Sequence, residues 1–324
     1  MNYSENALTI LTLKQYKGIG KAWIIKNYKE NLPIELLINL INKDSKESQP
    51  ITREDFELDR QNMRNSIEKF SNCIDGIVAF GDIDFPPSRG RVKNSEQPIV
   101  LFYKGDLTLL SPSNKNVAVI GLLTPDQHTI SQEKKVVHEL VRQNVTIVSG
   151  LAMGCDAIAH QATLELKGKT VAILPSSLLN IMPAANQGLA QEILETGGLL
   201  ISEYYLEPKS KMELSGRYQE RDRLQALFSD FILLAASYAK NDLGNDSGSR
   251  LAMEYAASYS IPRGVIYEEN IDHNNPKYDL NRQIIKEENG GFVFTNENYM
   301  QKVKEILNLN PTISNNVVQT NLFE

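Results

Sequence analysis

A glycine-rich turn that follows a β-branched run is the first place where this chain could bind a charged ligand. Val145 to Val148 read as a strand, Gly150 and Gly154 follow, and a helix is expected to begin near Asp156. Glycine lets the backbone approach an anion closely, and a helix N-terminus presents unpaired N–H groups. Asp156 would cap the helix, and Ser149 could donate a hydroxyl hydrogen bond. The alternative interpretation is a tight α/β turn without a ligand.

Arg221 and Arg223 are the cations that could complete such a site. Residues i and i+2 of a helix do not share a face, so one can reach a phosphate while the other pairs with a neighbouring carboxylate or a helix end. The stretch from Lys209 to Arg223 carries five basic residues against three acidic ones: Lys209, Lys211, Arg217, Arg221 and Arg223 against Glu213, Glu220 and Asp222. If this modest basic patch forms about three or four phosphate contacts, affinity for a polyanion should fall steeply with salt.

Other residues near the patch could add contacts to a nucleic acid. Ser247, Gly248 and Ser249 open a later helix and could hold a second phosphate, although a plain N-cap explains them equally well. Tyrosines available for base stacking are Tyr204, Tyr205 and Tyr218, and internal packing is their alternative role.

The first 75 residues are predicted to be helical and polar. Between two apolar helical stretches stands a glycine turn flanked by lysines, which resembles a helix-hairpin-helix: Lys17, Gly18, Gly20 and Lys21. In that motif the turn offers backbone amides to a DNA phosphate while the lysines add charge. A packing or partner-docking module is the alternative.

Catalytic, metal and cofactor chemistry is not indicated. Cys73 and Cys155 are far apart, and the four histidines, His128, His138, His160 and His273, lack metal-ligand spacing. No serine-histidine-acid or paired-carboxylate arrangement stands out, so we predict no enzyme activity, no metal and no cofactor. Cys155 is either a thiol with a lowered pKa or, more simply, a small residue in a crowded turn.

Composition indicates an ordinary globular protein. The 324 residues are 41% hydrophobic and carry a net charge of −6, which argues against wholesale coating of nucleic acid. Apolar runs are shorter than a membrane span and the N-terminus lacks a signal-peptide pattern, so we predict a cytoplasmic protein without a membrane partner.

Strands and helices alternate from residue 116 onward, which predicts a parallel sheet covered on both faces. Ligands of such sheets bind beyond the carboxyl ends of the strands. The expected strands lie near 117–120, 145–148, 170–174, 199–202, 231–234 and 264–267. The expected helices lie near 131–143, 157–167, 186–195, 221–228 and 249–260.

Several ordered motifs together resemble the DprA/Smf DNA-processing family. The string from Val148 to His160, Val-Ser-Gly-Leu-Ala-Met-Gly-Cys-Asp-Ala-Ile-Ala-His, looks like its signature. Segments that agree in the same order include those beginning at Phe80, Leu101, Gly168, Met182, Leu200, Arg221, Ser247 and Asn281. The similarity covers about residues 8–300, and a set of ordered motifs is far more specific than one glycine turn.

The resemblance implies an α/β fold, namely an extended Rossmann-like doubly wound, mostly parallel sheet, preceded by a small all-α helix-hairpin-helix or SAM-like domain. The implied domains are residues 1–75, 76–310 and a tail of 311–324. It also implies single-stranded DNA binding without catalysis, a homodimer, and a RecA-type recombinase as partner. The implied nucleic-acid site comprises Gly121, Ser149, Gly150, Gly154, Asp156, Lys169, Asn186, Arg217, Arg221, Arg223, Ser247, Gly248 and Ser249.

The chain departs from the family pattern in ways that keep other functions open. The family's Gly-Ser-Arg after the first strand reads Gly121-Leu122-Leu123 here, so one cation of the basic pocket is gone. One alternative is an antitoxin-like component of a defence module, with a phosphoribosyltransferase-type toxin as partner, and another is a nucleotide sensor. A LOG-type phosphoribohydrolase is disfavoured, because its double-glycine loop is missing before Glu254, which is expected to face solvent or a salt bridge.

Overall fold

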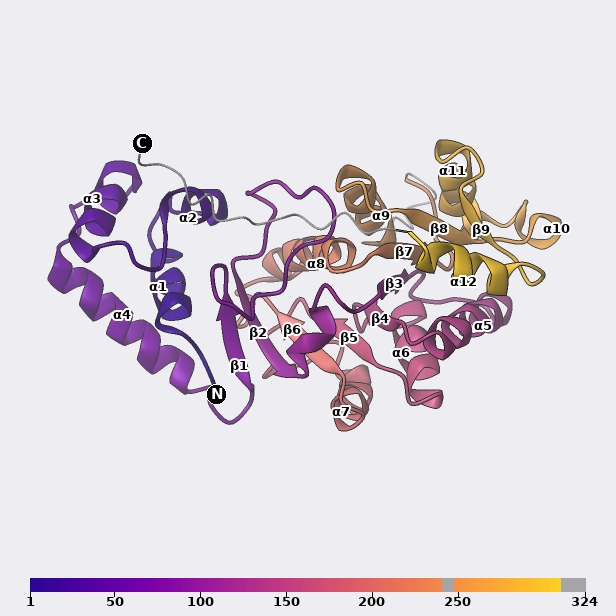
Figure 1. Ribbon diagram of the computed structural model, residues 1–324, viewed down its shortest axis with the longest axis horizontal. Coiled ribbons are helices and arrows are strands. Elements are labelled where there is room, and N and C mark those ends of the chain that lie inside the picture. The colour runs from indigo at the N-terminus through magenta and orange to yellow at the C-terminus, as the bar shows by residue number, and fades with distance from the viewer. Residues whose placement is uncertain (241–247, 310–324) are drawn as a thin grey trace.

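The computed structural model describes residues 1–240 and 248–309. The chain begins with four helices at one end of the molecule (Figure 1): α1 (Glu5–Leu13), α2 (Lys21–Asn27), α3 (Ile34–Asp44) and α4 (Arg53–Glu68). The Ser4 side chain caps α1 by accepting a hydrogen bond from the Ala7 N–H, and Thr52 and Asp55 form a capping box at α4. The prediction that the first 75 residues are helical is confirmed.

Within the described residues nine strands form one sheet in the order β1-β2-β6-β5-β4-β3-β7-β8-β9. β1 pairs antiparallel with β2 and β2 with β6, whereas every other pair is parallel. The strands are β1 (Gly76–Ala79), β2 (Val100–Gly105), β3 (Asn116–Ile120), β4 (Thr146–Ser149), β5 (Thr170–Ile173), β6 (Leu199–Ser202), β7 (Phe231–Leu234), β8 (Arg263–Ile266) and β9 (Phe292–Phe294).

Helices cover both faces of the sheet (Figure 1). One face carries α5 (Gln127–Arg142), α6 (Cys155–Glu165) and α7 (Gln187–Glu195), and the other carries α8 (Lys211–Leu227), α9 (Gly248–Ser258) and α11 (Asp279–Glu287). α12 (Tyr299–Leu307) packs against α5, and the shorter elements are η1 (Leu107–Leu110), η2 (Ala184–Asn186), α10 (Glu269–Asp272) and η3 (Pro276–Tyr278). This arrangement is the predicted doubly wound α/β fold.

The strand order places a topological switch between β3 and β7. From β3 the chain runs toward β4 on one side, and from β7 it runs toward β8 on the other. Loops leave two such neighbouring strands in opposite directions, which opens a crevice at their carboxyl ends where α/β proteins bind ligands. The turn after β4 borders this crevice.

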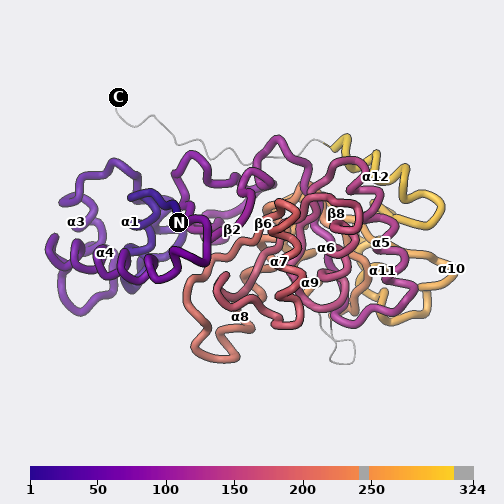
Figure 2. Tube along the Cα trace, turned by 90° about the horizontal axis from the view of Figure 1, so that it is seen from below, coloured from indigo at the N-terminus to yellow at the C-terminus, as the bar shows by residue number. Residues whose placement is uncertain are grey.

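The hydrophobic core joins the N-terminal helices to the sheet. One cluster lies within the sheet and the helices around it. A second cluster contains Leu8 and Ile41 of the helices together with Ile77, Phe102 and Leu200 of the sheet. The two parts of the chain therefore bury a common apolar surface, although Figure 2 shows the helices extending away from the sheet at one end of an elongated molecule.

The six expected parallel strands and the five expected helices are present, and their boundaries differ for physical reasons. α8 begins ten residues before the expected position, at Lys211, because the Ser210 side chain accepts a hydrogen bond from the Glu213 N–H and starts the helix there. β9 was not predicted, since three residues are too few to establish a periodic pattern. The expected tail, residues 311–324, lies outside the described residues.

Across residues 1–240 and 248–309, no helix has both the length and the apolar character needed to cross a membrane.

Candidate nucleic-acid interface

The turn after β4 has the expected strand-turn-helix geometry. Gly154, with a φ of 77°, precedes the first residue of α6, and Leu151 also has a positive φ, of 57°. A Cβ at Gly154 would lie 2.2 Å from the Leu122 carbonyl oxygen, so glycine is required there. Within the described residues the N–H groups of Met153 and Gly154 have no hydrogen-bond acceptor. The turn thus leaves two backbone donors available beside the N-terminus of an eleven-residue helix.

Arg221 packs against this turn from inside the protein. Its side chain is 7% exposed, and its Nη1 and Nε atoms each lie 3.2 Å from a carboxylate oxygen, of Asp156 and Asp222 respectively. A Cβ at Gly150 would lie only 1.0 Å from Nη1, so the missing side chain at Gly150 makes room for the guanidinium group. This burial corrects the expectation that Arg221 contacts a phosphate at the exposed edge.

Asp222 is buried beside Arg221 and near Asp156, and its pKa is raised. Burial raises the pKa of Asp222, Arg221 opposes the shift and Asp156 adds to it, so the value is about 7. Because the pKa in the folded state lies above the ordinary value of 3.8, the contribution of this group to stability is full at low pH and is lost as pH rises through about 7.

We therefore expect Asp222→Asn to be more stable than the wild type at pH 8.5, by on the order of 2 kcal/mol. The difference should shrink toward pH 4, where the wild-type carboxyl is protonated as well. Urea unfolding at the two pH values measures it. A variant less stable than the wild type at both pH values would show that the carboxylate is needed in its charged form.

Arg223 is also turned inward. Its guanidinium group, 2% exposed, donates two hydrogen bonds of 2.8 Å to Glu203 and lies 3.6 Å from Glu220. Burial alone would raise the pKa of Glu203, but Arg223 and Lys21 outweigh it and lower the pKa to about 2. Arg223 is thus one half of a buried ion pair, which corrects the expectation of a phosphate contact.

Three further residues expected at the phosphate support the turn instead. The Ser149 hydroxyl donates a 2.7 Å hydrogen bond to a main-chain carbonyl of β3. The Asn186 amide donates to the Leu151 and Ala152 carbonyls at 2.8 and 3.1 Å. Asp156 is the second residue of α6 rather than its cap, and its carboxylate accepts from the Ala152 N–H at 3.3 Å. These polar groups hold the turn in shape and are already partnered.

Lys169 lies at the wrong edge of the sheet for a shared site. It immediately precedes β5, at the amino end of that strand, and its Nζ donates a 2.6 Å hydrogen bond to the Thr196 carbonyl. The sequence could have shown this, because a residue before a parallel strand cannot lie at the edge where the strands end.

The crevice at the topological switch brings together other predicted residues. Gly121 follows β3, and a Cβ there would lie 2.6 Å from the Cys155 sulfur. The Ser249 hydroxyl donates a 2.9 Å hydrogen bond to the Gly121 carbonyl, and Gly248 is the first residue of α9. Ser247 lies outside the described residues. Gly121 after β3, the turn after β4 and the first residues of α9 therefore meet at one edge.

Arg217 belongs to the basic patch from Lys209 to Arg223, but its charge is already paired within the protein. Its guanidinium carbon lies 4.2 Å from the centre of the Tyr204 ring, and its nitrogens donate to the Leu206 carbonyl and to Glu213 at 2.7 and 2.6 Å. The side chain is 7% exposed. The expectation that Arg217 presents a free cation to DNA is therefore wrong.

The three tyrosines differ in their surroundings. Tyr204 lies under Arg217, and Tyr205 packs against Phe102 with the ring centres 5.5 Å apart. Tyr218 is half-buried on α8. The internal role weighed for these residues applies to Tyr205.

Cys155 is a packing residue. It is buried, and burial together with Glu133 raises the pKa of its thiol. Glu254 is exposed and pairs with Arg250 at 2.7 Å, as the sequence predicted. In the part of the chain that the structure describes, no group of three or more His, Cys, Asp or Glu side chains is placed to hold a metal ion.

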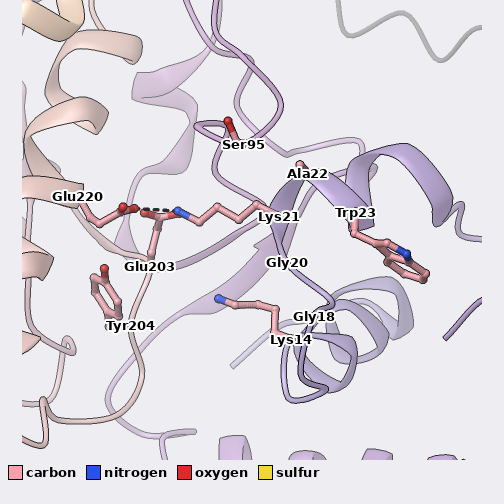
Figure 3. Close-up of a pocket in the computed structure, with 10 residues that line it drawn as sticks. All are labelled: Lys14, Gly18, Gly20, Lys21, Ala22, Trp23, Ser95, Glu203, Tyr204 and Glu220. Atoms are coloured by element: carbon pink, nitrogen blue, oxygen red, sulfur yellow. Dashed lines mark hydrogen bonds and ion pairs between the residues drawn. The ribbon is translucent and has the colours of Figure 1, made fainter. Parts of the chain in front are cut away.

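The predicted N-terminal hairpin is present between α1 and α2. Its glycine turn includes Gly18 at a φ of 87°. Lys21 is not available to DNA as a free cation, because its Nζ lies 2.9 Å from Glu220 and 3.3 Å from Glu203. The hairpin lines a hollow of about 600 Å³ that faces α8 and the loop after β6 (Figure 3).

The exposed groups at the carboxyl edge include lysines and apolar side chains, together with Glu207 in the loop after β6. Lys209 and Lys211, at the start of α8, are exposed. Loops after successive strands and the start of α8 also expose apolar side chains that sequence reasoning missed: Leu123, Met153, Leu179, Leu206 and Met212. For the first four of these residues the signal was a position three to six residues after a strand end, whereas Met212 is the second residue of α8.

Comparison with known proteins decides the family. A sequence model of the family described as DNA recombination-mediator protein A matches residues 76–304, which contain the whole sheet and its helices except the end of α12. The chain belongs to this family. The family assignment made from the ordered motifs is thereby confirmed, and the matched range begins where β1 begins.

Individual relatives agree. The chain is 29% identical to protein Smf of Synechocystis over 64% of its own length and 52% of that protein. It is 28% identical to DNA processing protein DprA of Streptococcus pneumoniae over 77% of its own length and 84% of that protein. The chain therefore spans about half of the first relative and most of the second.

Two solved structures resemble it. The crystal structure of DNA processing protein A from Streptococcus pneumoniae superposes with a TM-score of 0.70 at 24% identity, over 94% of this chain and 98% of that one, which shows the shared fold. A structure describing the single-stranded DNA binding mode of DNA processing protein A from Helicobacter pylori superposes with a TM-score of 0.53 at 28% identity, over 65% and 87% of the two chains.

Proposed function

We propose that this member of a DNA-processing family binds single-stranded DNA along the carboxyl edge of its sheet. The observation that carries the proposal is the turn after β4, where the N–H groups of Met153 and Gly154 lack acceptors within the described residues. Lys209 and Lys211 stand exposed where α8 begins, after β6 of the same sheet. The Helicobacter pylori relative that binds single-stranded DNA supports the choice of ligand.

In this proposal the arginines position the site. Arg221 fills the space beside Gly150 and neutralises Asp156, so the turn keeps its open shape. Phosphate oxygens then accept hydrogen bonds from the backbone, and the nucleobases contact the apolar side chains that follow the strands. Sequence-independent binding follows, since backbone amides and apolar groups read no base identity.

The small number of free cations sets the salt dependence. Two to three phosphate contacts give a slope of log affinity against log salt of about −1.4 to −2.1 for a single strand. The slope would be steeper if Arg221 and Arg223 contacted phosphates in addition to the lysines.

Lys209→Gln combined with Lys211→Gln should weaken binding of a single strand roughly tenfold and reduce the salt slope by about 1.4, because two phosphate contacts are lost. Fluorescence anisotropy of a labelled oligodeoxythymidine measures both quantities. The matched control is Lys286→Gln combined with Lys304→Gln, which removes the same charge from exposed positions on α11 and α12. Equal losses in the two double variants would refute the proposed edge.

The partners implied by the resemblance, namely a homodimer, a RecA-type recombinase and a cognate toxin, stay predictions. The same holds for the absence of catalysis and for the cytoplasmic location. The nucleotide-sensor alternative predicts that a mononucleotide raises the melting temperature as strongly as an oligonucleotide does. The DNA-binding proposal predicts a larger increase with the oligonucleotide.

A further inference from the structure

In and around the hollow between the N-terminal hairpin and the sheet, positive side chains outnumber negative ones by one. Lys14 and Lys21 reach into it from the helical side, and Glu203, Tyr204 and Glu220 line the opposite side (Figure 3). These residues belong to parts of the chain that meet only in the folded protein. The hollow is not part of the turn after β4.

The two carboxylates at the hollow are already neutralised. Glu203 accepts two hydrogen bonds from Arg223 and lies 3.3 Å from Lys21, and Glu220 lies 2.9 Å from Lys21. Arg223 and Lys21 thus pair with both carboxylates, Glu203 and Glu220. Counting Lys14 as well gives three cations against two anions, so one positive charge is left over.

Lys14 is the residue that carries this excess. Within the described residues its Nζ makes no hydrogen bond and no ion pair, and in Figure 3 its ammonium end points toward the side of the hollow that Glu203 and Tyr204 line. Although the side chain as a whole is exposed, enclosure of its end lowers the pKa of Lys14. Glu203 opposes the shift, and Lys21 and Arg223 add to it. A single anion beside Lys14 would offset the desolvation of its ammonium group and the repulsion from Lys21 and Arg223.

The wall next to Lys14 leaves room for that anion. A Cβ at Gly20 would meet no heavy atom within 4 Å. Tyr204 offers a hydroxyl and Ser95 a second one on the far wall. A hollow of about 600 Å³ accommodates a phosphate group with part of its nucleoside.

We infer that this hollow binds one phosphate group, held by Lys14 where the hairpin meets the sheet. The inference extends the proposed DNA binding to a second contact point, and it also holds for a free phosphate compound. An anion seated there would bridge the helical part of the chain to the loop after β6.

The chain's single tryptophan, Trp23, is among the residues that line the hollow; in Figure 3 its indole ring points away from Lys14, so it reports on binding through α2, which it shares with Lys21. Its fluorescence should change saturably when inorganic phosphate, thymidine monophosphate or an oligodeoxythymidine of about 12 nucleotides is added. Equal affinity for the last two would identify a mononucleotide phosphate as the occupant, and tighter binding of the oligonucleotide would identify a strand phosphate. Either result supports the site.

Variants of Lys14 and Gly20 test the assignment. Lys14→Met should weaken all observed binding at Trp23 at least tenfold, Lys14→Arg should restore it, and Lys29→Met, at an exposed lysine of the same helical region, should leave it unchanged. Gly20→Asp puts a carboxylate into the open space at the N-cap of α2, a position that Asp tolerates well, and should abolish binding, whereas Gly20→Asn should not.

Unchanged affinity in both Lys14→Met and Gly20→Asp, or no binding of any of the three compounds in isothermal titration calorimetry, overturns the inference. The proposed DNA binding fails separately. If inorganic phosphate binds in a Lys14-dependent way but no oligonucleotide binds, the hollow stands and the DNA-binding proposal falls. If an oligonucleotide binds independently of Lys14 and inorganic phosphate does not bind, the DNA-binding proposal stands and the inference about the hollow falls.

Discussion

Arg223→Met is expected to destabilise the protein by about 3 to 5 kcal/mol, because it leaves the Glu203 carboxylate buried beside a single remaining cation. Glu203 is 6% exposed and loses both hydrogen bonds from the guanidinium group. The cost comes from the stranded charge rather than from lost volume, since methionine retains most of the apolar stem. Urea unfolding at neutral pH, with an unchanged dependence on urea, measures it.

The matched control removes the charge from both partners. Arg223→Met combined with Glu203→Leu should be more stable than Arg223→Met alone, since no unpaired buried charge is left. A single variant that loses less than about 1 kcal/mol would mean that the pair is in practice solvated.

Gly150→Ala is expected to lower the free energy of unfolding by about 3 to 5 kcal/mol, because it displaces Arg221. The added Cβ would lie 1.0 Å from Arg221 Nη1, so the guanidinium group must leave and Asp156 and Asp222 lose their shared counter-ion. The turn after β4 should then lose both its shape and its affinity for a single strand.

Two comparisons isolate that mechanism. Gly216→Ala, on the same helix as Arg221, adds a Cβ into open space and should stabilise the protein by up to about 1 kcal/mol. If Gly150→Ala acts by displacing Arg221, combining it with Arg221→Ala should cost no more than the larger single effect. Strict additivity would place the damage elsewhere in the turn.

Local patterns predicted the scaffold of the edge well. The β-branched run before Gly150 and the glycine at position 154 were enough to identify the strand, the turn and the start of α6, because each needs only neighbouring residues. The alternation of strands and helices likewise predicted the doubly wound sheet. The ordered motifs then identified the family, which one glycine turn could not do.

The roles of the arginines could not be read in the same way. The spacing of Arg221 and Arg223 correctly indicated that they face different directions, but their partners, Asp156 and Glu203, lie on other elements of the fold. An exposed cation and a buried ion pair look alike in sequence until the acidic partner is located. The family resemblance favoured phosphate contacts for both arginines, whereas in the structure both are buried in ion pairs.

Hydrogen exchange at the turn after β4 tests the central claim most directly. On addition of a single-stranded oligodeoxythymidine, the amides of Met153 and Gly154 should become protected from exchange, because a phosphate would accept the hydrogen bonds that no described residue accepts. The amides of α11 and α12, at the far end of the sheet, should not change. Protection that leaves Met153 and Gly154 untouched while the oligonucleotide is bound would contradict the account.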